Sequence, residues 1–287
     1  MKKWTCVAVA TIIMLTVMSG CSGVGSSGDE MNYLRLDGAT ANIPLAIGFY
    51  QEYYNLSQEE AEDLVQFSKS SQSYLNFLES GADLLLVSKA DTGTQEIIDQ
   101  SGIQLEYIPL RRDALCFIVN EENPVDSLTD AQIKDIYQGK ILSWEDVGGE
   151  PWPMIAFQRN EDSGSQAMMR RLVMDGLEMI EPRRAQSMGE MLEEIAEYYN
   201  AWGAIGYTTY YFADEMYRQP EVKFLQINGI APTERTIGDG TYPYLNENNI
   251  VIRDDAKKNS EVRKAVAWLK SNEGKRMMES LNYIPVD

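Results

Sequence analysis

Short apolar runs alternate with amphipathic stretches over most of the chain. A short apolar run bounded by turn-forming residues predicts a buried strand, whereas apolar positions three and four residues apart predict a helix. The predicted strands are residues 33–36, 64–67, 84–87, 105–108, 114–119, 154–157, 204–207, 223–227 and 249–252. The predicted helices are residues 45–54, 72–78, 129–138, 165–174, 189–199 and 260–281, the last broken near Asn272-Glu273-Gly274. This alternation predicts an α/β fold with parallel sheets.

Both ends of the predicted helix at residues 129–138 carry sequence signals. Thr129 and Gln132 have the spacing of a capping box, in which each side chain bonds the backbone of the other residue. Gly139 stands where a helix commonly ends in a left-handed residue. We therefore expect this helix to begin and end as the pattern indicates.

The beginning of the chain departs from the alternation and predicts a targeting segment. Two lysines precede the apolar run of residues 4–17, whose 14 residues are too few to span a membrane and are typical of a signal peptide. Small residues stand before Cys21, an arrangement similar to the lipobox of bacterial lipoproteins. That similarity implies a signal peptide over residues 1–20 and a diacylglyceryl thioether on Cys21; the alternative is an ordinary secretory signal with an incidental cysteine. Residues 21–31, rich in Gly and Ser, predict a flexible tether.

Charge and the absence of histidine narrow the classes of function. The 287 residues include 44 Asp and Glu, 25 Lys and Arg and no His; the formal charge is −19, or −21 without the leader and its two lysines. An acidic chain is a poor partner for nucleic acid or anionic lipid, because both attract basic patches. Without histidine there is no Ser-His-Asp triad, no Cys-His pair, no His-ligated zinc and no imidazole base. The composition therefore favours binding over catalysis.

The three cysteines have separate surroundings. Cys6 lies in the leader, Cys21 is the predicted lipid attachment site, and Cys116 stands alone in an apolar run. The mature chain is therefore expected to form no intramolecular disulfide, and Cys116 is predicted to be a small buried hydrophobe.

Ser, Thr and small residues follow three of the predicted strands, each time directly before a predicted helix. The N–H groups of a first helical turn have no partner inside the helix, and the positive end of the helix dipole lies behind them. Such a helix start binds anions, and hydroxyl groups add further donors. For any single one of the three, an ordinary N-cap is the simpler interpretation. The three segments are residues 37–42, 68–71 and 158–165.

The third segment contains more than a cap. Arg159 lies four residues before Ser163, and Ser163-Gly164-Ser165 combines two hydroxyls with a small residue. A guanidinium is a planar fork that suits a tetrahedral oxyanion, and Glu161 is predicted to hold it in place. The alternative is a surface Arg-Glu pair beside a cap, which stabilises little. We predict an oxyanion site at this segment.

These residues resemble the phosphate-binding proteins of ABC transporters, which belong to the type II periplasmic-binding-protein superfamily. The resemblance covers most of the chain behind the leader. It is strongest over residues 120–125, 128–129, 136–141, 144, 147–149, 159–165 and 205–207. It implies an α/β fold of two lobes, joined by a two-stranded hinge, with a ligand cleft between them. Lobe 1 is expected to comprise residues 32–109 and 212–287, and lobe 2 residues 110–211.

The resemblance also implies the binding residues, which would hold the oxyanion through hydroxyls, backbone amides and one guanidinium. They are Thr40, the Ala41 amide, Ser70, Arg159, Ser163, the Gly164 amide and Ser165. Ser88-Lys89 falls where the family has Ser followed by Asp or Arg, and that Asp accepts the proton of hydrogen phosphate. Lysine cannot accept a hydrogen bond. If Lys89 points into the cleft it adds positive charge, and if it points outward the cleft lacks the acceptor. The stretch from Tyr242 to Asn246 lacks the Arg that the family often has after Tyr-Pro.

The function implied is that of a lipid-anchored, extracytoplasmic solute-binding protein. It would be a monomer that captures inorganic phosphate or a related oxyanion by hinge closure and delivers it to an ABC permease. No enzyme activity, cofactor, metal site or nucleic-acid partner is expected. Two alternatives from other classes stay open. One is an oxyanion sensor or surface binding module that feeds no permease. The other is a hydrolase with a Ser-Lys pair, although the chain has neither the Ser-x-x-Lys motif of β-lactamases nor a Gly-x-Ser-x-Gly elbow.

Overall fold

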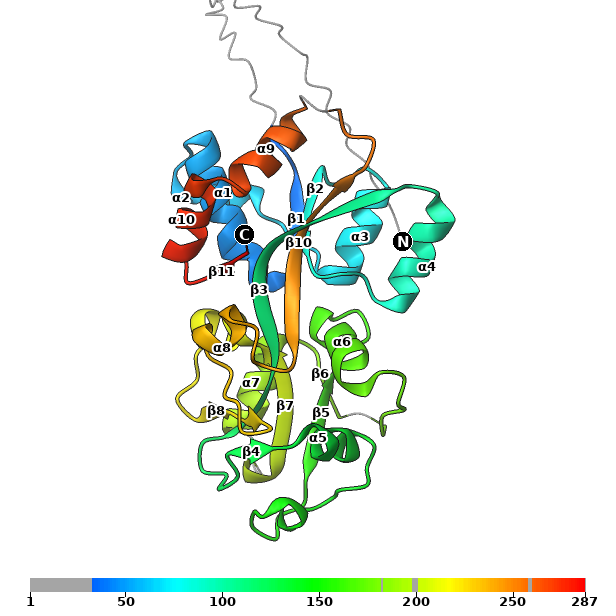
Figure 1. The fold of residues 1–287 in the computed structure, drawn as a ribbon, viewed down its shortest axis with the longest axis vertical. Helices are drawn as coiled ribbons and strands as arrows, with labels where there is room; N and C mark the ends of the chain where they lie inside the picture. The colour runs from blue at the N-terminus through cyan, green and yellow to red at the C-terminus, as the bar shows by residue number, and fades with distance from the viewer. Residues whose placement is uncertain (1–32, 182, 198–200, 258–259, 287) are drawn as a thin grey trace, which may run out of the picture. The chain divides into compact units, whose positions relative to one another are not determined.

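A mixed β-sheet runs through the part of the chain that the structure describes (Figure 1). The computed structural model describes residues 33–181, 183–197, 201–257 and 260–286, so the predicted signal peptide, Cys21 and the predicted tether lie outside the described residues. Along the sheet the strands follow the order β1 (Leu36–Gly38), β2 (Leu84–Val87), β10 (Leu245–Arg253), β3 (Leu105–Asn120), β7 (Ala204–Thr209), β5 (Ile155–Arg159) and β6 (Arg183–Ala185).

The prediction of parallel sheets is wrong for the middle of this sheet. The outer pairs are parallel, β1 with β2 and β5 with both β6 and β7. Between them β10 runs antiparallel to β2 and β3, and β3 runs antiparallel to β7. Alternating strands and helices predict local parallel units, but they do not reveal a late strand such as β10 that enters the sheet from the far end of the chain.

β3 and β10 form a long two-stranded ribbon, which we call the hinge ribbon (Figure 1). Two predicted strands, residues 105–108 and 114–119, are one continuous strand of 16 residues. The stretch between them contains Arg111 and Asp113. Both side chains are buried, and since they are two residues apart in a strand they point to the same face.

The helices associated with β1 and β2 include one that ends where a strand was predicted to begin. They are α1 (Ile43–Tyr54), α2 (Gln58–Leu64), α3 (Ser70–Leu78), α4 (Thr92–Ser101), α9 (Glu261–Leu269) and α10 (Asn272–Ser280), and a short 3-10 turn, η1 (Thr40–Asn42), precedes α1. The strand predicted at residues 64–67 is wrong. Ser57 and Glu60 form a capping box that starts α2, and the helix continues to Leu64. The apolar positions there therefore belong to a helix and the loop behind it.

The predicted C-terminal helix, residues 260–281, is divided into α9 and α10 by Ser271. The Ser271 hydroxyl accepts hydrogen bonds from the backbone N–H groups of Glu273 and Gly274, which starts a new helix. Gly274 is required at this start, because an added Cβ would lie 2.5 Å from the carbonyl oxygen of Leu269. The break therefore lies one residue before the position that the sequence predicted.

The elements associated with β5, β6 and β7 contain the helix whose ends were predicted. They are α5 (Asp130–Tyr137), α6 (Gly164–Met168), the π-helical turns η3 (Met169–Met174) and η5 (Phe212–Met216), α7 (Met188–Glu197), α8 (Glu234–Gly238) and the short strands β4 (Ser127–Leu128), β8 (Val222–Phe224) and β9 (Gln226–Ile227). The capping box of Thr129 and Gln132 is present, and Gly139 has a φ of 74° after the end of α5. Both predicted signals of α5 are therefore confirmed.

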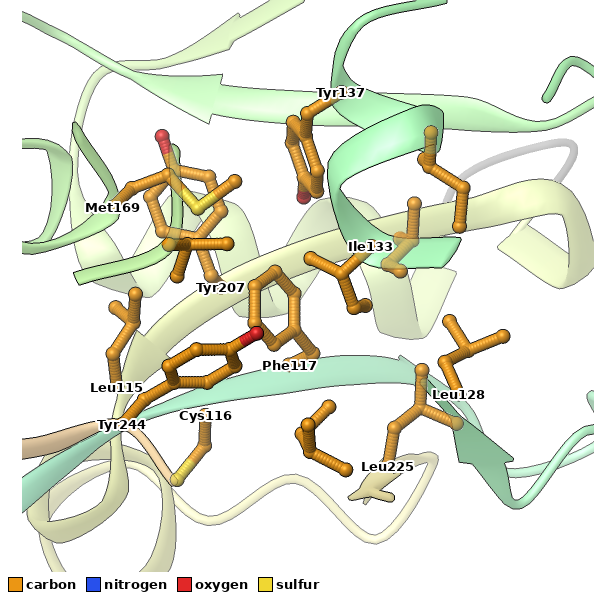
Figure 2. Close-up of a cluster of buried hydrophobic side chains, with 14 of the residues drawn as sticks. Leu115, Cys116, Phe117, Leu128, Ile133, Tyr137, Met169, Tyr207, Leu225 and Tyr244 are labelled. Carbon is orange, nitrogen blue, oxygen red and sulfur yellow. The ribbon is translucent and has the colours of Figure 1, made fainter. Parts of the chain in front are cut away.

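An aromatic cluster fills the core between α5, β3 and β7 (Figure 2). Phe117 lies 6.0, 6.2 and 6.0 Å from the ring centroids of Tyr137, Tyr207 and Tyr244. Cys116 is fully buried in the same cluster, which confirms its predicted role as a small hydrophobe. Within the described part of the chain, no helix is both long and apolar enough to cross a membrane.

Candidate binding site

One cavity, with a volume of about 270 Å³, brings the predicted binding residues together. All seven residues predicted to hold an oxyanion line it, and so does Ser88, whereas Lys89 does not. The predicted residues at the cavity are Thr40, Ala41, Ser70, Ser88, Arg159, Ser163, Gly164 and Ser165. Segments far apart in sequence therefore meet at one place, and the contact of these residues with a ligand stays a prediction.

A buried carboxylate, Asp37, joins the first two of the three predicted segments. It lies in β1 and is 5% exposed. Its Oδ1 accepts a hydrogen bond from the backbone N–H of Ser68 at 2.8 Å, and its Oδ2 accepts from the Ser68 hydroxyl at 2.6 Å. Because a buried charge needs donors around it, these bonds fix the loop before α3 against the end of β1. Thr40 and Ser70 reach the same cavity as a result.

The residue directly before α3 has a strained backbone. Lys69 has φ 73° and ψ 170°, a region that only glycine adopts readily. Such a conformation costs about 1–3 kcal/mol and persists only where surrounding contacts hold it. Here the Lys69 carbonyl accepts a hydrogen bond from the backbone N–H of Ser73 at 2.9 Å. The strained residue places Ser70, the first residue of α3, at the cavity.

Arg159, the last residue of β5, supplies a guanidinium to the cavity and is 4% exposed. Its Nε donates to the carbonyl of Ala185 at 3.1 Å and its Nη2 to the carbonyl of Gln186 at 3.4 Å. Its backbone N–H donates to the Tyr207 hydroxyl and to Gln166 Oε1, both at 3.2 Å. Burial lowers the pKa of Arg159, but an arginine pKa starts so far above neutrality that the group stays charged. The cavity therefore contains a fixed positive charge.

Glu161 pairs with a different arginine from the one predicted. Its carboxylate accepts two hydrogen bonds from Arg170, at 2.9 and 2.8 Å, in an exposed pair. The guanidinium of Arg159 is oriented by backbone carbonyls at the end of β6 instead. Sequence spacing indicated that the acid is near Arg159, but the path of the loop decides which guanidinium the carboxylate faces.

Gly164 allows two of the predicted segments to approach closely. It is the first residue of α6, and an added Cβ would lie 2.4 Å from the Ser70 hydroxyl oxygen. Beside it the hydroxyls of Ser163 and Ser165 are 2.9 Å apart, and both residues are buried. The N–H groups of the first turn have no acceptor inside the helix. The beginnings of α3 and α6 therefore meet at the cavity and present hydroxyl and N–H donors to it.

Four polar residues of the hinge ribbon were not predicted as part of the site. In the strand register Arg111 lies opposite Asn248 and Asp113 lies opposite Asn246. Side chains two residues apart share a face, and all four residues are at most 5% exposed. Asp113, Asn246 and Asn248 line the cavity. The sequence carries no clear signal for this face, because the intervening residues Arg112 and Glu247 are charged as well and hide the alternation.

Arg111 and Asp113 form a buried ion pair in the hinge ribbon, with Nη1 and Oδ2 3.1 Å apart. The Arg111 guanidinium lies over the rings of Tyr211 and Tyr283, with Cζ 5.4 and 4.5 Å from their centroids. The other carboxylate oxygen, Oδ1, accepts from the backbone N–H groups of Ala114 and Tyr211. The pair has no net charge, and Asp113 still places an acceptor group on the cavity wall.

Thr209, the last residue of β7, is a further lining residue that was not predicted. Its hydroxyl is buried and has no hydrogen-bond partner among the residues that the structure describes. Buried hydroxyls are almost always hydrogen-bonded, so an unpaired one on a cavity wall indicates that a ligand or water completes it. Thr209 therefore supports the cavity as a binding site independently of the helix starts.

The charges around the cavity favour an anion although the whole chain carries a formal charge of −19. Arg159 and Lys69 are positive lining residues, and the acid Asp113 is paired with Arg111. Exposed charges farther than about 8–10 Å are largely screened at physiological salt, so the local balance decides. A small cavity whose wall combines a guanidinium, hydroxyls and amide groups is suited to bind a small anionic solute.

The comparison with known proteins identifies the family. Residues 25–273 match the PBP superfamily domain, and the chain belongs to this superfamily. The two-lobed α/β fold expected from the resemblance is thereby confirmed. The lobe boundaries stay a prediction, namely residues 32–109 with 212–287 for lobe 1 and residues 110–211 for lobe 2.

Several phosphate-binding proteins are similar to this chain over most of their length. The phosphate-binding protein PstS of Staphylococcus saprophyticus is 24% identical over 267 residues, which cover 89% of this chain and 83% of the relative. A crystal structure of a phosphate ABC transporter substrate-binding protein with bound phosphate from Clostridium perfringens superposes with a TM-score of 0.70 at 22% identity, covering 89% of this chain and 100% of that one. An ABC-type phosphate transport receptor from Vibrio cholerae gives a TM-score of 0.66 at 23% identity, covering 88% and 99%.

Lys89 is exposed and lies outside the main cavity, in a small adjoining pocket with Arg171. Of the two interpretations that the sequence left open, the structure favours the outward position.

We expect Lys89→Ala to weaken the binding of inorganic phosphate by less than about threefold at physiological salt, because only long-range charge is lost. Titration calorimetry in low and high salt checks this. A tenfold loss that persists in 1 M NaCl would instead place Lys89 at the ligand.

Proposed function

We propose that this protein is an extracytoplasmic solute-binding protein that captures inorganic phosphate and delivers it to an ABC permease. The observation that carries the proposal is the cavity, where the buried guanidinium of Arg159 meets hydroxyls from the separate starts of α3 and α6. Its volume of about 270 Å³ is below the roughly 300–1,000 Å³ of pockets for drug-sized ligands, so it suits a small ion. Relatives that are named as phosphate-binding proteins support the same ligand.

The proposed mechanism is binding by closure, with no bond made or broken. Ser70 contributes a donor from α3, and Arg159 and Ser163 contribute donors from β5 and α6. An anion that accepts hydrogen bonds from both sides is bound more tightly when the two sides are close, so it shifts the population toward the closed form. The close approach of Gly164 to Ser70 supports this mechanism.

We further propose that Asp113 gives the site its preference for a protonated oxyanion. Lys89 does not supply an acceptor, but the Asp113 carboxylate lines the cavity. Phosphate carries a proton at neutral pH and can donate it to this acceptor, whereas sulfate carries none and leaves two acceptors facing each other. An unmade buried hydrogen bond costs about 1–3 kcal/mol, which corresponds to roughly 5- to 150-fold weaker binding.

The experiment that tests both proposals is a titration of the purified protein, freed of bound ligand, with phosphate, sulfate and molybdate. We expect phosphate to bind without turnover and sulfate to bind at least about fivefold more weakly. Equal affinities for phosphate and sulfate would contradict the role of Asp113 and leave the oxyanion site. No phosphate binding, or release of product from phosphoryl esters, would contradict the proposed function itself.

We also propose that the protein is a monomer held at the cell membrane by a lipid on Cys21. The two lysines, the apolar run of residues 4–17 and the small residues before Cys21 support this location. The Gly/Ser-rich residues 21–31 suit a tether that leaves the binding domain free to reach a permease. Loss of phosphate uptake on deletion of the gene distinguishes transport from sensing alone.

A further inference from the structure

We propose that Arg171 is a positioning residue of the binding site, which acts through Asn246 to fix the direction in which the Ser88 hydroxyl donates its hydrogen bond into the cavity. The inference rests on the proposed function as an anion-binding protein. It adds to the site a residue that does not line the main cavity.

Arg171, Asn246 and Ser88 form a chain of hydrogen bonds, which we call the relay. The direction of the relay follows from the chemistry of arginine. Nη2 of Arg171, in η3, donates to Oδ1 of Asn246 at 2.9 Å. A guanidinium has donors and no acceptor, so the amide oxygen of Asn246 faces Arg171 and the amide nitrogen faces away. That nitrogen, Nδ2, donates to the Ser88 hydroxyl oxygen at 2.7 Å. The Ser88 oxygen is therefore an acceptor in this bond, and its own hydrogen points elsewhere.

The surroundings of Ser88 place its hydroxyl on the wall of the main cavity, where a bound anion can accept that hydrogen. Ser88 follows β2, is 8% exposed and lines the cavity. Its backbone carbonyl accepts a hydrogen bond from the Tyr74 hydroxyl at 2.7 Å. Among the described residues, the Ser88 hydroxyl makes no hydrogen bond as a donor. A buried hydroxyl hydrogen without an acceptor is unfavourable, so a ligand in the cavity completes the relay.

A second relay from the hinge ribbon has the same direction. Nε of Arg111 donates to Oδ1 of Asn42 at 2.8 Å, and Nδ2 of Asn42 donates to Oδ1 of Asn248 at 3.1 Å. The amide nitrogen of Asn248, which lines the cavity, is thereby left as a donor. Both relays begin at an arginine and end in a donor at the cavity. This is the arrangement that an ion rich in acceptor oxygens requires.

The effect of Arg171 through Asn246 is separable from the effect of its charge. Arg171 shares a small adjoining pocket with Ser70, Ser88 and Gly164, so its charge also acts on the cavity from a distance. Salt screens this long-range effect of the Arg171 charge, with a screening length of about 3 Å at 1 M, but salt does not change the direction of a hydrogen bond. Measurements in 1 M NaCl therefore report the relay.

The test is a double-mutant cycle of Arg171→Met and Ser88→Ala, with affinity for inorganic phosphate measured by titration calorimetry in 1 M NaCl. Each single substitution removes the same oriented donor, so we expect each to weaken binding roughly 10-fold. The double variant should bind no more than about twofold more weakly than Ser88→Ala alone, since residues that act as one unit are not additive. Losses that multiply, or Arg171→Met with unchanged affinity, would overturn the relay.

Arg170→Met is the matched control, because it removes a charge from the neighbouring residue, whose guanidinium pairs with Glu161 at the surface. We expect Arg170→Met to change the affinity for phosphate less than twofold in 1 M NaCl. We also expect Arg171→Met to retain the thermal unfolding midpoint of the unaltered protein. Equal losses of phosphate affinity in the two variants would overturn the relay.

If the unaltered protein binds no phosphate, the proposed function fails and this inference fails with it. If it binds phosphate and the cycle is additive, only this inference fails.

Asn246→Asp is a second variant with an effect that a structural role does not predict. The new carboxylate still accepts from Arg171, so we expect the unfolding midpoint to be retained or raised. It cannot donate to Ser88, whose hydroxyl would donate to the carboxylate and turn away from the cavity. Phosphate affinity in 1 M NaCl should therefore fall at least as far as in Ser88→Ala. Retained affinity would overturn the inference.

Discussion

The Arg159→Ala variant is expected to bind phosphate at least about 100-fold more weakly than the unaltered protein, because each hydrogen bond from a charged donor contributes about 1.5–3 kcal/mol. The guanidinium is 4% exposed, and its Nε and Nη2 already donate to the carbonyls of Ala185 and Gln186. These bonds hold the planar fork in one orientation before any ligand arrives, so little entropy is lost on binding. Titration calorimetry at neutral pH measures the loss.

Arg159→Lys is the control that separates charge from geometry. Lysine keeps the positive charge but has no planar fork, so we expect an affinity between those of the unaltered protein and Arg159→Ala. The unfolding midpoint of each variant shows whether the protein still folds without the bonds to Ala185 and Gln186. Unchanged affinity in a folded Arg159→Ala variant would falsify the assignment of this cavity as the oxyanion site.

Gly164→Ala is expected to weaken phosphate binding by about 30-fold or more, equivalent to about 2 kcal/mol. An added Cβ would lie 2.4 Å from the Ser70 hydroxyl oxygen, a distance that real atoms do not adopt. Either the Ser70 hydroxyl turns away or the beginnings of α3 and α6 separate, and in both cases an anion between them loses hydrogen bonds on one side. Calorimetry measures the affinity, and small-angle scattering with and without phosphate measures whether the protein still closes.

Gly93→Ala is the matched control for this substitution. Gly93 lies in the first turn of α4, and an added Cβ there meets Asp91 Oδ1 at 3.4 Å, an ordinary contact. We expect unchanged phosphate affinity, since Gly93 is not among the residues that line the main cavity. If Gly164→Ala binds phosphate and compacts like Gly93→Ala, the close approach of α3 and α6 is not needed for binding.

The helix starts of the site were predictable because their chemistry is local. A Ser or Thr before a helix, with small residues beside it, presents unpaired N–H groups wherever the helix lies. Arg159 was predictable for a similar reason, since an arginine four residues before Ser163-Gly164-Ser165 must lie close to that helix start. The structure places all of these residues at one cavity. The lining role of Thr209 had no such local signal, because an isolated threonine at the end of a strand is common.

The orientation of side chains was not predictable. Lys89 follows Ser88 directly, yet Ser88 lines the cavity and Lys89 is exposed. Glu161 is near Arg159 in sequence, yet its carboxylate pairs with Arg170. The strand predicted at residues 64–67 is also wrong, since a capping box at Ser57 starts a helix that reaches Leu64. For the side chains of Lys89 and Glu161 several local arrangements are open, and packing against the rest of the chain selects one, whereas the capping box at Ser57 is a local signal that the sequence already carried.

The sequence by itself determined which chemistry this protein presents: no histidine for catalysis, three helix starts with hydroxyls, and one arginine beside the third. Only the tertiary structure decided how the hinge ribbon contributes. It pairs Asp113 with Asn246 and Arg111 with Asn248 across strands from distant parts of the chain, and it brings Arg171 to the Asn246 amide. The physical reason is that a hydrogen bond has a direction, and the direction of an amide or hydroxyl is fixed by a neighbouring group that can only donate or can only accept.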